Sequence, residues 1–354
     1  MTVTATTGDL EFYRRELTGY CYRMLGSAFE ADDAVQETML RAWKAVHAFE
    51  GRSSLRSWLY RIATNVCLDA LRGEKRRALP MDLGPAAPPD ESLLRPWPAT
   101  DLWVTPIPDA RVVPEGGDPA EIAAVRDSVR LAFVTALQHL PPRQRAALIL
   151  CSVLRLSALE ASGVLETSVA SVNSALQRAR AALAALPADQ NPGPLSFSGD
   201  SGPGGSASGT SGTSGASGAS GADAALLDRY VDAFQRYDMA ALMNVIREDA
   251  VMTMPPFELW VRGNRDITAW MVEPTPSLCR GSILVPVRAN GVRAWGQYKP
   301  AAEPGSGLTP WALQVHEVSD GKLSRLTFFL DTARLFPLFG LPGRLPGHPS
   351  GPGA

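Results

Sequence analysis

Two segments rich in residues that break regular structure divide this chain of 354 residues. The first, residues 79–120, is acidic and rich in proline, which removes backbone donors and interrupts helices and sheets. We therefore expect an irregular connector there. The second, residues 188–221, contains the run GTSGTSGASGASG and is expected to be a flexible linker. Three blocks remain that can fold, namely residues 1–78, 121–187 and 222–340.

The composition narrows the class of protein. Hydrophobic residues make up 45% of the chain, which is enough for compact cores and excludes global disorder. No two of the four cysteines form a Cys-x-x-Cys pair, and the four histidines are scattered, so we expect neither a metal site nor a cofactor. The first residues lack a basic and apolar signal, and no apolar run is long enough to span a bilayer. We therefore expect a cytoplasmic protein without membrane contact.

The first block is predicted to be helical. In DDAVQETMLRAWKAV the apolar residues recur at helical spacing, whereas Asp33, Gln36 and Glu37 lie on other faces of the helix. The predicted buried stripe consists of Val35, Met39, Ala42 and Val46. A second helix is predicted from about Leu55 to Leu71, with Ser53 or Ser54 as its N-cap.

Basic charge gathers in the second half of this block, although the whole chain has a formal net charge of -2. Between Arg41 and Arg77 nine residues are Lys or Arg and three are acidic, and the segment FEGRSSLRSWLYRIATNVCLDALRGEKRR mixes the basic residues with aromatic ones. That combination suits stacking on unpaired bases together with attraction to phosphates. The alternative is that the aromatic residues form core and the arginines a solvated face. For Trp43 and Trp58, which both sit on apolar stripes, a core position is the preferred interpretation.

The second block has the layout of a helix-turn-helix motif. In LSALEASGVLETSVASVNSALQRARAAL the last helix should bury a stripe of apolar residues and expose polar ones that can contact base edges and phosphates. The predicted buried stripe is Val169, Val172, Leu176, Ala179 and Leu183. The predicted exposed residues are Ala170, Asn173, Ser174, Gln177 and Arg178, with Arg180 also able to reach phosphates. An ordinary amphipathic helix in a bundle is the alternative.

The third block is predicted to have an α+β fold. A long amphipathic helix is followed by five strand-like runs, in one of which Trp311, Leu313 and Val315 occupy alternate positions. Asn290-Gly291 and Asp320-Gly321 are typical of two-residue hairpin turns. We therefore expect helices packed on an antiparallel sheet. Residues 341–354 are expected to form a disordered tail.

Taken together, these motifs resemble the extracytoplasmic-function (ECF) group of bacterial sigma factors, which have two helical domains named region two and region four. The resemblance covers residues 10–77 and 125–186 and implies a non-enzymatic protein that directs transcription initiation. The implied partners are core RNA polymerase, through its β′ clamp helices and β flap, and promoter DNA. In such factors the acidic connector threads through the polymerase towards the active site.

The same resemblance implies roles for particular residues. Those expected to contact the β′ clamp helices are Asp33, Gln36 and Glu37. Those expected along the minus-ten element, where the loop 47–54 would capture a flipped base, are Arg52, Ser53, Arg56, Arg61, Asn65 and Asp69. Those expected at the minus-thirty-five element are Asn173, Ser174, Gln177, Arg178 and Arg180.

The third block resembles the SnoaL-like branch of the cone-shaped α+β folds, whose members include isomerases, cyclases and binding modules. A regulatory role is preferred, through a small-molecule ligand or by intramolecular docking across the flexible linker. Two alternatives are a ligand-sensing helix-turn-helix regulator and a SnoaL-like isomerase or cyclase fused to a DNA-binding module. An enzyme of this fold would need a proton-abstracting site in an apolar cavity. The candidates for it are Asp249, Asp331, His316, Tyr230 and Tyr298.

Overall fold

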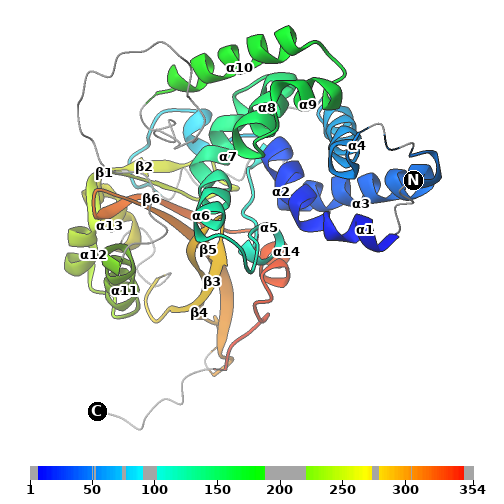
Figure 1. Ribbon diagram of the computed structural model, residues 1–354. Coiled ribbons are helices and arrows are strands. Elements are labelled where there is room, and N and C mark those ends of the chain that lie inside the picture. Colours follow the sequence, from blue (N-terminus) through cyan, green and yellow to red (C-terminus); the bar gives the residue numbers. More distant parts are fainter. Residues whose placement is uncertain are drawn as a thin grey trace, which may run out of the picture. The chain divides into compact units, whose positions relative to one another are not determined.

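The structure is a computed structural model that describes residues 7–49, 51, 53–73, 77–90, 102–187, 221–272, 279–303 and 305–346. The chain forms two compact units (Figure 1). The N-terminal unit comprises Met1–Arg77 and Val104–Gly218, and the C-terminal unit comprises Ala78–Trp103 and Ala219–Ala354. Most of the predicted linker and Arg52 lie outside the described residues, as do residues 347–354.

The first part of the N-terminal unit is a group of helices: α1 (Thr7–Phe12), α2 (Arg14–Leu25), α3 (Ala28–Ala45) and α4 (Leu55–Ala70). Val35, Met39 and Ala42 are buried, as the helical periodicity predicts. Ser54 is the N-cap of α4, with its Oγ accepting a hydrogen bond from Ser57 N at 3.1 Å.

The two tryptophans of this part differ. Trp58 is 8% exposed, so its predicted core position is confirmed. Trp43 is 57% exposed, so the same prediction for Trp43 is wrong. The reason is the helical angle, because Trp43 lies three residues after Leu40, which is itself 51% exposed, and shares its side of α3 rather than that of the buried stripe.

The second part of the unit contains α5 (Asp109–Val112), α6 (Pro119–Ser128), α7 (Leu131–Gln138), α8 (Pro142–Leu148), a π-helical turn (Ile149–Val153), α9 (Ala158–Val164) and α10 (Val169–Ala184). Ser157 and Glu160 form a capping box that starts α9, and Ser168 caps α10. On α10, Val172 and Ala179 are buried as predicted. Val169 is 37% exposed, contrary to prediction, because it is the first residue of the helix and precedes the packed part.

The C-terminal unit contains α11 (Gly221–Gln235), α12 (Met239–Val245), β1 (Ile246–Thr253), β2 (Trp260–Arg262), α13 (Asn264–Val272), β3 (Ile283–Ala289), β4 (Val292–Pro300), β5 (Leu308–Ser319), β6 (Lys322–Phe329) and α14 (Thr332–Leu338). The six strands form one sheet in the order β2-β1-β6-β5-β4-β3. The α+β class is confirmed, but the sheet is mixed rather than antiparallel because β1 and β6, which are far apart in sequence, pair in parallel. Both predicted hairpin turns are present, and Asn290 and Asp320 adopt positive φ angles there.

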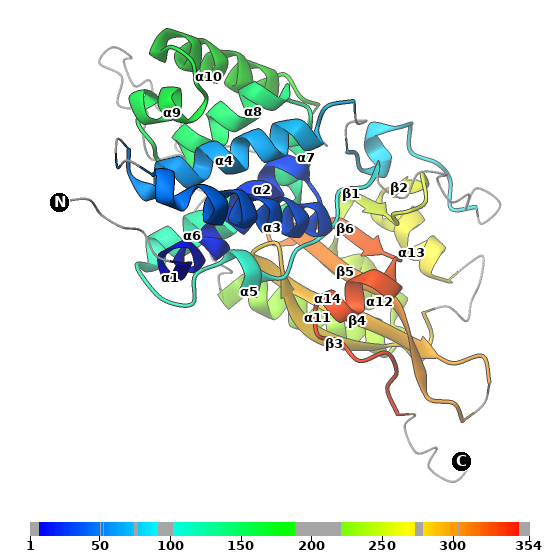
Figure 2. The same cartoon turned by 90° about the vertical axis from the view of Figure 1, so that its right-hand side faces the viewer.

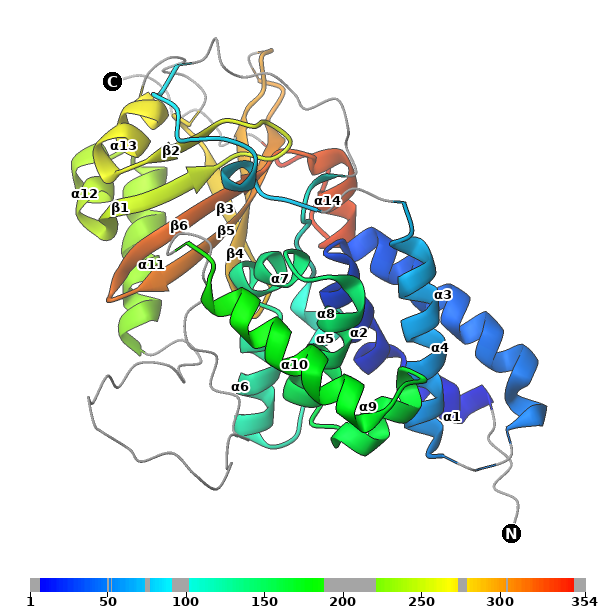
Figure 3. The same ribbon diagram turned by 90° about the horizontal axis from the view of Figure 1, so that it is seen from above.

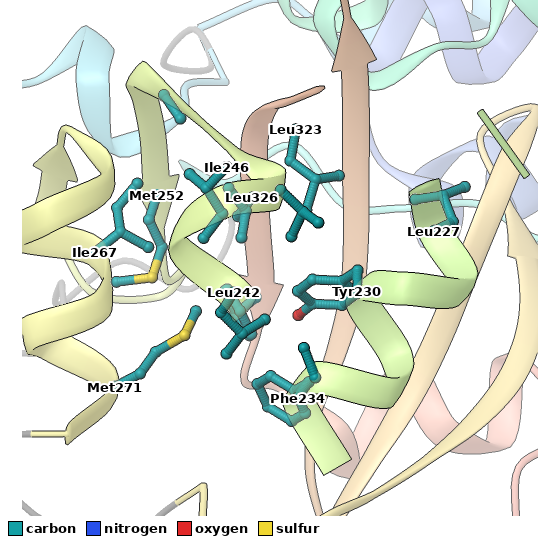
Figure 4. Close-up of a cluster of buried hydrophobic side chains, with 14 of the residues drawn as sticks. Leu227, Tyr230, Phe234, Leu242, Ile246, Met252, Ile267, Met271, Leu323 and Leu326 are labelled. Atoms are coloured by element: carbon teal, nitrogen blue, oxygen red, sulfur yellow. The ribbon is translucent and has the colours of Figure 1, made fainter. Parts of the chain in front are cut away.

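Helices cover both faces of this sheet. Figures 2 and 3 show α11, α12 and α13 against one face and α14 against the other. The first face carries the main core, in which Tyr230, Phe234 and Leu242 pack towards strand residues such as Leu326 (Figure 4). On the second face, residues 341–346, which the sequence assigned to a disordered tail, are ordered, because Leu345 pairs with Leu308 and Tyr298 donates a hydrogen bond to Pro342 O at 2.7 Å.

The proline-rich connector is held at both of its described ends. In the C-terminal unit, Trp260 Nε1 donates to Gly84 O at 2.8 Å and Ala87 N donates to Trp260 O at 2.9 Å. In the N-terminal unit, Thr105 N donates to Gly26 O at 3.0 Å, and Thr105 O accepts from Tyr22 Oη at 2.8 Å. As expected, the described connector has only short helical turns and an isolated bridge, Ala78 to Trp103, before α6 begins.

Candidate functional site

One exposed face of α3 combines polar and apolar side chains. Asp33 and Gln36 are exposed, and 45% of the Glu37 side chain is accessible even though Arg41 Nε donates to Glu37 Oε1 at 2.6 Å. Leu40 and Trp43 continue the same face, since they lie four and seven residues beyond Gln36. That spacing was present in the sequence and could have identified Trp43 as part of this surface.

Helix α4 and the loop before it carry most of the residues expected at the minus-ten element. Ser53, Asn65 and Asp69 are exposed, and Arg61 is half-buried. Asp69 Oδ1 lies 3.3 Å from Arg72 Nη1, and Asp69 Oδ2 lies 3.7 Å from Arg41 Nη1.

Arg56 is placed differently from the other expected minus-ten residues. Its Nε donates to Glu16 Oε1 at 2.8 Å, and its guanidinium carbon lies 5.4 Å from the centroid of the Tyr60 ring. The Arg56 side chain therefore joins α4 to α2, and 38% of it remains accessible.

A cavity of about 580 Å³ lies between the N-terminal end of α4 and α9. Of the residues expected at the minus-ten element, it brings together Ser53 and Arg61, whereas Arg56, Asn65 and Asp69 are not part of its wall. An aromatic pair, Phe49 and Trp58, lies beside them with ring centroids 5.2 Å apart. The complete lining is Phe49, Ser53, Ser54, Ser57, Trp58, Arg61, Leu159, Glu160, Gly163 and Val164.

Helix α10 exposes the residues expected at the minus-thirty-five element on one surface. Its buried side is formed by Val172 and Ala179, with Leu176 and Leu183 half-buried, and it packs against α8 and α9. The exposed residues are Asn173, Ser174, Gln177, Arg178 and Arg180. A helix of this length with amide and guanidinium groups on its free side is suited to the major groove of DNA.

The face of the C-terminal sheet that α11, α12 and α13 cover holds a series of buried, hydrogen-bonded polar side chains. Tyr230 Oη donates to Gln314 Oε1 at 2.8 Å and lies 2.9 Å from His316 Nε2. Gln314 Nε2 donates to Gln297 Oε1 at 2.8 Å, and Gln297 Nε2 donates to Ser282 Oγ at 3.0 Å. Because the single Tyr230 proton goes to Gln314, His316 Nε2 must carry the hydrogen that it shares with Tyr230.

Burial determines the protonation states of Tyr230 and His316. It lowers the pKa of His316 to about 3, so the imidazole is neutral, and it raises the pKa of Tyr230 well above its usual value. Within the described part of the chain, His316 Nδ1 has no hydrogen-bond partner. The ring packs against Tyr230, Trp295 and Phe328 at centroid distances of 4.8 to 5.8 Å.

The five candidates for proton abstraction do not converge. Tyr230 and His316 meet in the core, but Tyr298 donates to Pro342 O. Asp249 is exposed and accepts from Arg247 Nη2 at 3.0 Å, and Asp331 is exposed at the start of α14. Among the described residues there is also no group of His, Cys, Asp and Glu placed to hold a metal ion.

Comparisons with known proteins identify the family. Residues 10–77 match the Sigma-70 region 2 family and residues 130–183 match Sigma-70, region 4. The ECF RNA polymerase sigma factor SigG of Mycobacterium tuberculosis is 41% identical over 340 residues, which cover 95% of this chain and 83% of SigG. This chain belongs to the ECF RNA polymerase sigma factors. The sigma factor SigW of Bacillus subtilis is 29% identical over 174 residues, covering 49% of this chain and 84% of SigW.

The fold of this ECF sigma factor is shared with a solved structure. The crystal structure of the Mycobacterium tuberculosis ECF sigma factor SigJ aligns with a TM-score of 0.57 at 20% identity, covering 95% of this chain and all of that one. Region two of the sigma factor thus contains α1–α4, and region four contains α7–α10. The C-terminal unit, outside both regions, has an α+β fold with a six-stranded mixed sheet.

Two general properties accompany this membership. Sigma factors act by binding rather than by catalysis, so the chain is not an enzyme. Across the described part of the chain, every helix is too short or too polar to cross a membrane.

Proposed function

We propose that this ECF sigma factor brings core RNA polymerase to promoters through α3, α4 and α10, and that its C-terminal unit regulates this step by holding the connector. The three helices expose the residue types that these roles need. The observation that carries the regulatory part is the hydrogen bonding of the connector to β2 and to the Trp260 side chain.

The face of α3 is suited to a partner that is both basic and apolar. Asp33 and Glu37 supply negative charge, and Leu40 and Trp43 supply exposed apolar surface next to it. Exposed aromatic side chains at the centre of an interface commonly dominate its affinity. We assign this face to the β′ clamp helices of the polymerase, while region four would contact the β flap.

Charge reversal on α3 tests the docking face. Glu37→Lys should abolish binding to core polymerase, because it replaces a favourable charge with a repulsive one while leaving the buried side of α3 unchanged. Binding is measured with purified core enzyme, and a circular dichroism melt checks the fold. Glu258→Lys, an exposed acid of the C-terminal unit, is the matched control. Normal polymerase binding by Glu37→Lys would refute the assignment.

Promoter selection is assigned to α10 and α4. Asn173 can form a bidentate pair with adenine in the major groove, and Arg178 and Arg180 can reach phosphates. Asn173→Ala should therefore change which promoter is chosen more than it weakens nonspecific DNA binding. Transcription from a panel of promoters, compared with binding to random duplex, gives the two quantities. An equal loss in both would contradict base recognition by Asn173.

The connector links the C-terminal unit to transcription. A connector that threads through the polymerase cannot at the same time remain bonded to the Trp260 side chain and to β2. Each neutral hydrogen bond contributes about 1 kcal/mol. A few of them therefore shift the equilibrium between bound and released connector by roughly tenfold or more towards the bound form. The C-terminal unit would thus withhold the connector until the polymerase, or a ligand of this unit, shifts the balance.

Removal of one donor tests the regulatory part. Trp260→Phe keeps an aromatic ring but loses the Nε1 hydrogen that Gly84 O accepts, so transcription with core polymerase should rise. Trp270→Phe, a change of the same kind on α13, serves as the control. Deletion of all residues after Gly221 should raise transcription further. Unchanged promoter affinity and transcription in the truncated protein would refute the regulatory proposal.

A further inference from the structure

Two cations at one corner of the C-terminal sheet are each stacked on an aromatic ring. Lys299, near the end of β4, places its Nζ 3.5 Å from the centroid of the Trp311 ring of β5. Arg280, just before β3, places its guanidinium carbon 4.8 Å from the centroid of the Tyr237 ring, which follows α11. Within the described residues, neither cation forms an ion pair with a carboxylate. Aromatic rings rather than acids therefore stabilise these two charges.

The two cation–aromatic pairs belong to the same corner. Strands β3 and β4 are antiparallel neighbours, so the residues that precede β3 lie opposite the end of β4. Gly281, which follows Arg280, packs so closely on Pro300, which follows Lys299, that an added Cβ would lie 3.2 Å from Pro300 Cγ. The two positive charges are therefore neighbours in space although they come from different strands.

Aromatic surface adjoins these cations. Half-buried Trp270 and Trp311 pack against the main core, on the face of the sheet that α11, α12 and α13 cover. Tyr237 Oη donates to Met271 O at 3.2 Å, which places the end of α13 beside the Tyr237 ring. Flat aromatic surface next to a few convergent polar groups is the usual environment of a small organic ligand.

The buried polar series described above directs its hydrogens towards this corner. Tyr230 donates to Gln314, which donates to Gln297. Gln297 in turn donates to Ser282 Oγ, so the two amide dipoles are aligned head to tail. Their positive ends face Ser282, which lies immediately before β3 and is 2% exposed. Aligned dipoles polarise one another in a buried series and add to the positive potential of the two cations.

Two neutral donors complete the corner. Because Ser282 Oγ accepts from Gln297, its own hydrogen is left to donate, and no acceptor for it is found in the described part of the chain. The Cys279 thiol lies beside Gln297, and burial raises its pKa to about 11, so it keeps its hydrogen. Burial also lowers the pKa of Lys299, because it removes water from the ammonium group. The group is called here the cation corner and consists of Tyr237, Cys279, Arg280, Ser282, Lys299 and Trp311.

We propose that the cation corner is a binding site for a small aromatic carboxylate, whose carboxylate bridges Arg280 and Lys299 and whose ring packs beside Trp270 and Trp311. A negative ligand would supply the charge that no described carboxylate supplies, and its hydrogen bonds to two cations would be charge-assisted. An aromatic body suits the site better than inorganic phosphate would, because the neighbouring side chains are aromatic. Binding at the corner does not depend on the proposed function, whereas an effect of the ligand on the connector does.

Isothermal titration of the full-length chain with 2-naphthoate tests the site. We expect binding of one molecule per chain, weakened about tenfold or more by Lys299→Met and by Arg280→Gln, because each removes one charge-assisted contact. Lys299→Arg should keep most of the affinity. The matched controls are Lys322→Met on β6 and Arg265→Gln on α13, which change cations outside the corner and should bind as the wild type does. The uncharged analogue 2-naphthylmethanol should bind at least about tenfold more weakly than 2-naphthoate.

Three results would overturn the site. The first is no binding of 2-naphthoate at about 1 mM, and the second is equal binding of the uncharged alcohol, which would mean that only the aromatic surface is recognised. The third is an equal loss of affinity in the corner variants and in their controls. Circular dichroism melts accompany each variant. If Lys299→Met melts early, Arg280→Gln decides the test, because Arg280 is exposed and its replacement leaves the core unchanged.

Transcription with core polymerase separates the site from the proposed function. If the ligand releases the connector, 2-naphthoate should raise transcription by the wild type but not by Arg280→Gln. Binding with unchanged transcription supports the site and overturns the role of this ligand in regulation. Absence of binding overturns the site whatever the Trp260→Phe variant does, since that variant tests the connector alone.

Discussion

Acidification should destabilise the C-terminal unit through His316, whose imidazole is buried among Tyr230, Trp295 and Phe328. The folded pKa is about 3, because burial disfavours the charged form, whereas the unfolded pKa is about 6.5. Between these values the unfolded chain binds a proton that the folded unit rejects. Stability therefore falls as the pH drops below about 6.5 and continues to fall until about pH 3.

The stability that the C-terminal unit loses at pH 5 depends mainly on the pKa of His316 in the unfolded chain. A pH of 5 is about 1.5 units below the pKa of His316 in the unfolded chain. This difference corresponds to a loss of roughly 2 kcal/mol in the free energy of unfolding relative to pH 8. For a unit of this size, a loss of roughly 2 kcal/mol lowers the melting temperature by about 8 °C. His316→Gln should remove this component, because an amide can still donate to Tyr230 but does not titrate.

Differential scanning calorimetry of the full chain at pH 8, 7, 6 and 5 measures the effect as a double difference. The C-terminal transition of the wild type should fall by about 8 °C more between pH 8 and pH 5 than that of His316→Gln. His47→Gln, which changes an exposed histidine of the other unit, should leave the C-terminal transition as in the wild type. Equal pH dependence in wild type and His316→Gln would refute the burial argument.

Three further expectations concern stability and docking. Gly296→Ala should destabilise the C-terminal unit by about 1–3 kcal/mol in urea unfolding, because an added Cβ would lie 2.6 Å from Leu341 Cδ1; unchanged stability would mean that the end of the chain moves away freely. Ser54→Ala should cost about 1 kcal/mol through loss of the α4 N-cap to Ser57 N, and Ser54→Thr should restore most of it. Trp43→Ala should leave the free energy of unfolding within about 0.5 kcal/mol but weaken core-polymerase binding about tenfold, and unchanged binding would remove Trp43 from the docking face.

Local features of this protein could be predicted because they depend on neighbours in sequence. The buried stripe of α3 follows from helical periodicity, Ser54 and Ser168 cap helices because their hydroxyls reach an amide three residues on, and Asn290-Gly291 tolerates the positive φ angles of a hairpin turn. The exposed surface of α10 follows from the same periodicity. The roles given to these surfaces came from family resemblance.

Other features required the tertiary structure, because they join residues far apart in the chain. The spacing from Gln36 and Leu40 could have placed Trp43 on the exposed face of α3, but the burial of Trp58 depends on which helices pack beside α4. Tyr230 and His316 meet only because α11 lies across β5.

The same holds for the connector and for the contacts at the C-terminal end of α2. The connector is irregular by composition, but its attachment to Trp260 depends on the position of β2 in the folded unit. Buried hydrogen bonds join Arg23 to Ser128 and Arg145 to Met24, pairs separated by more than a hundred residues. The periodicity of the sequence determines which side of a helix or strand is apolar. Only the packing of elements far apart in the chain determines which residues contact that side and the polar groups at the ends of the element.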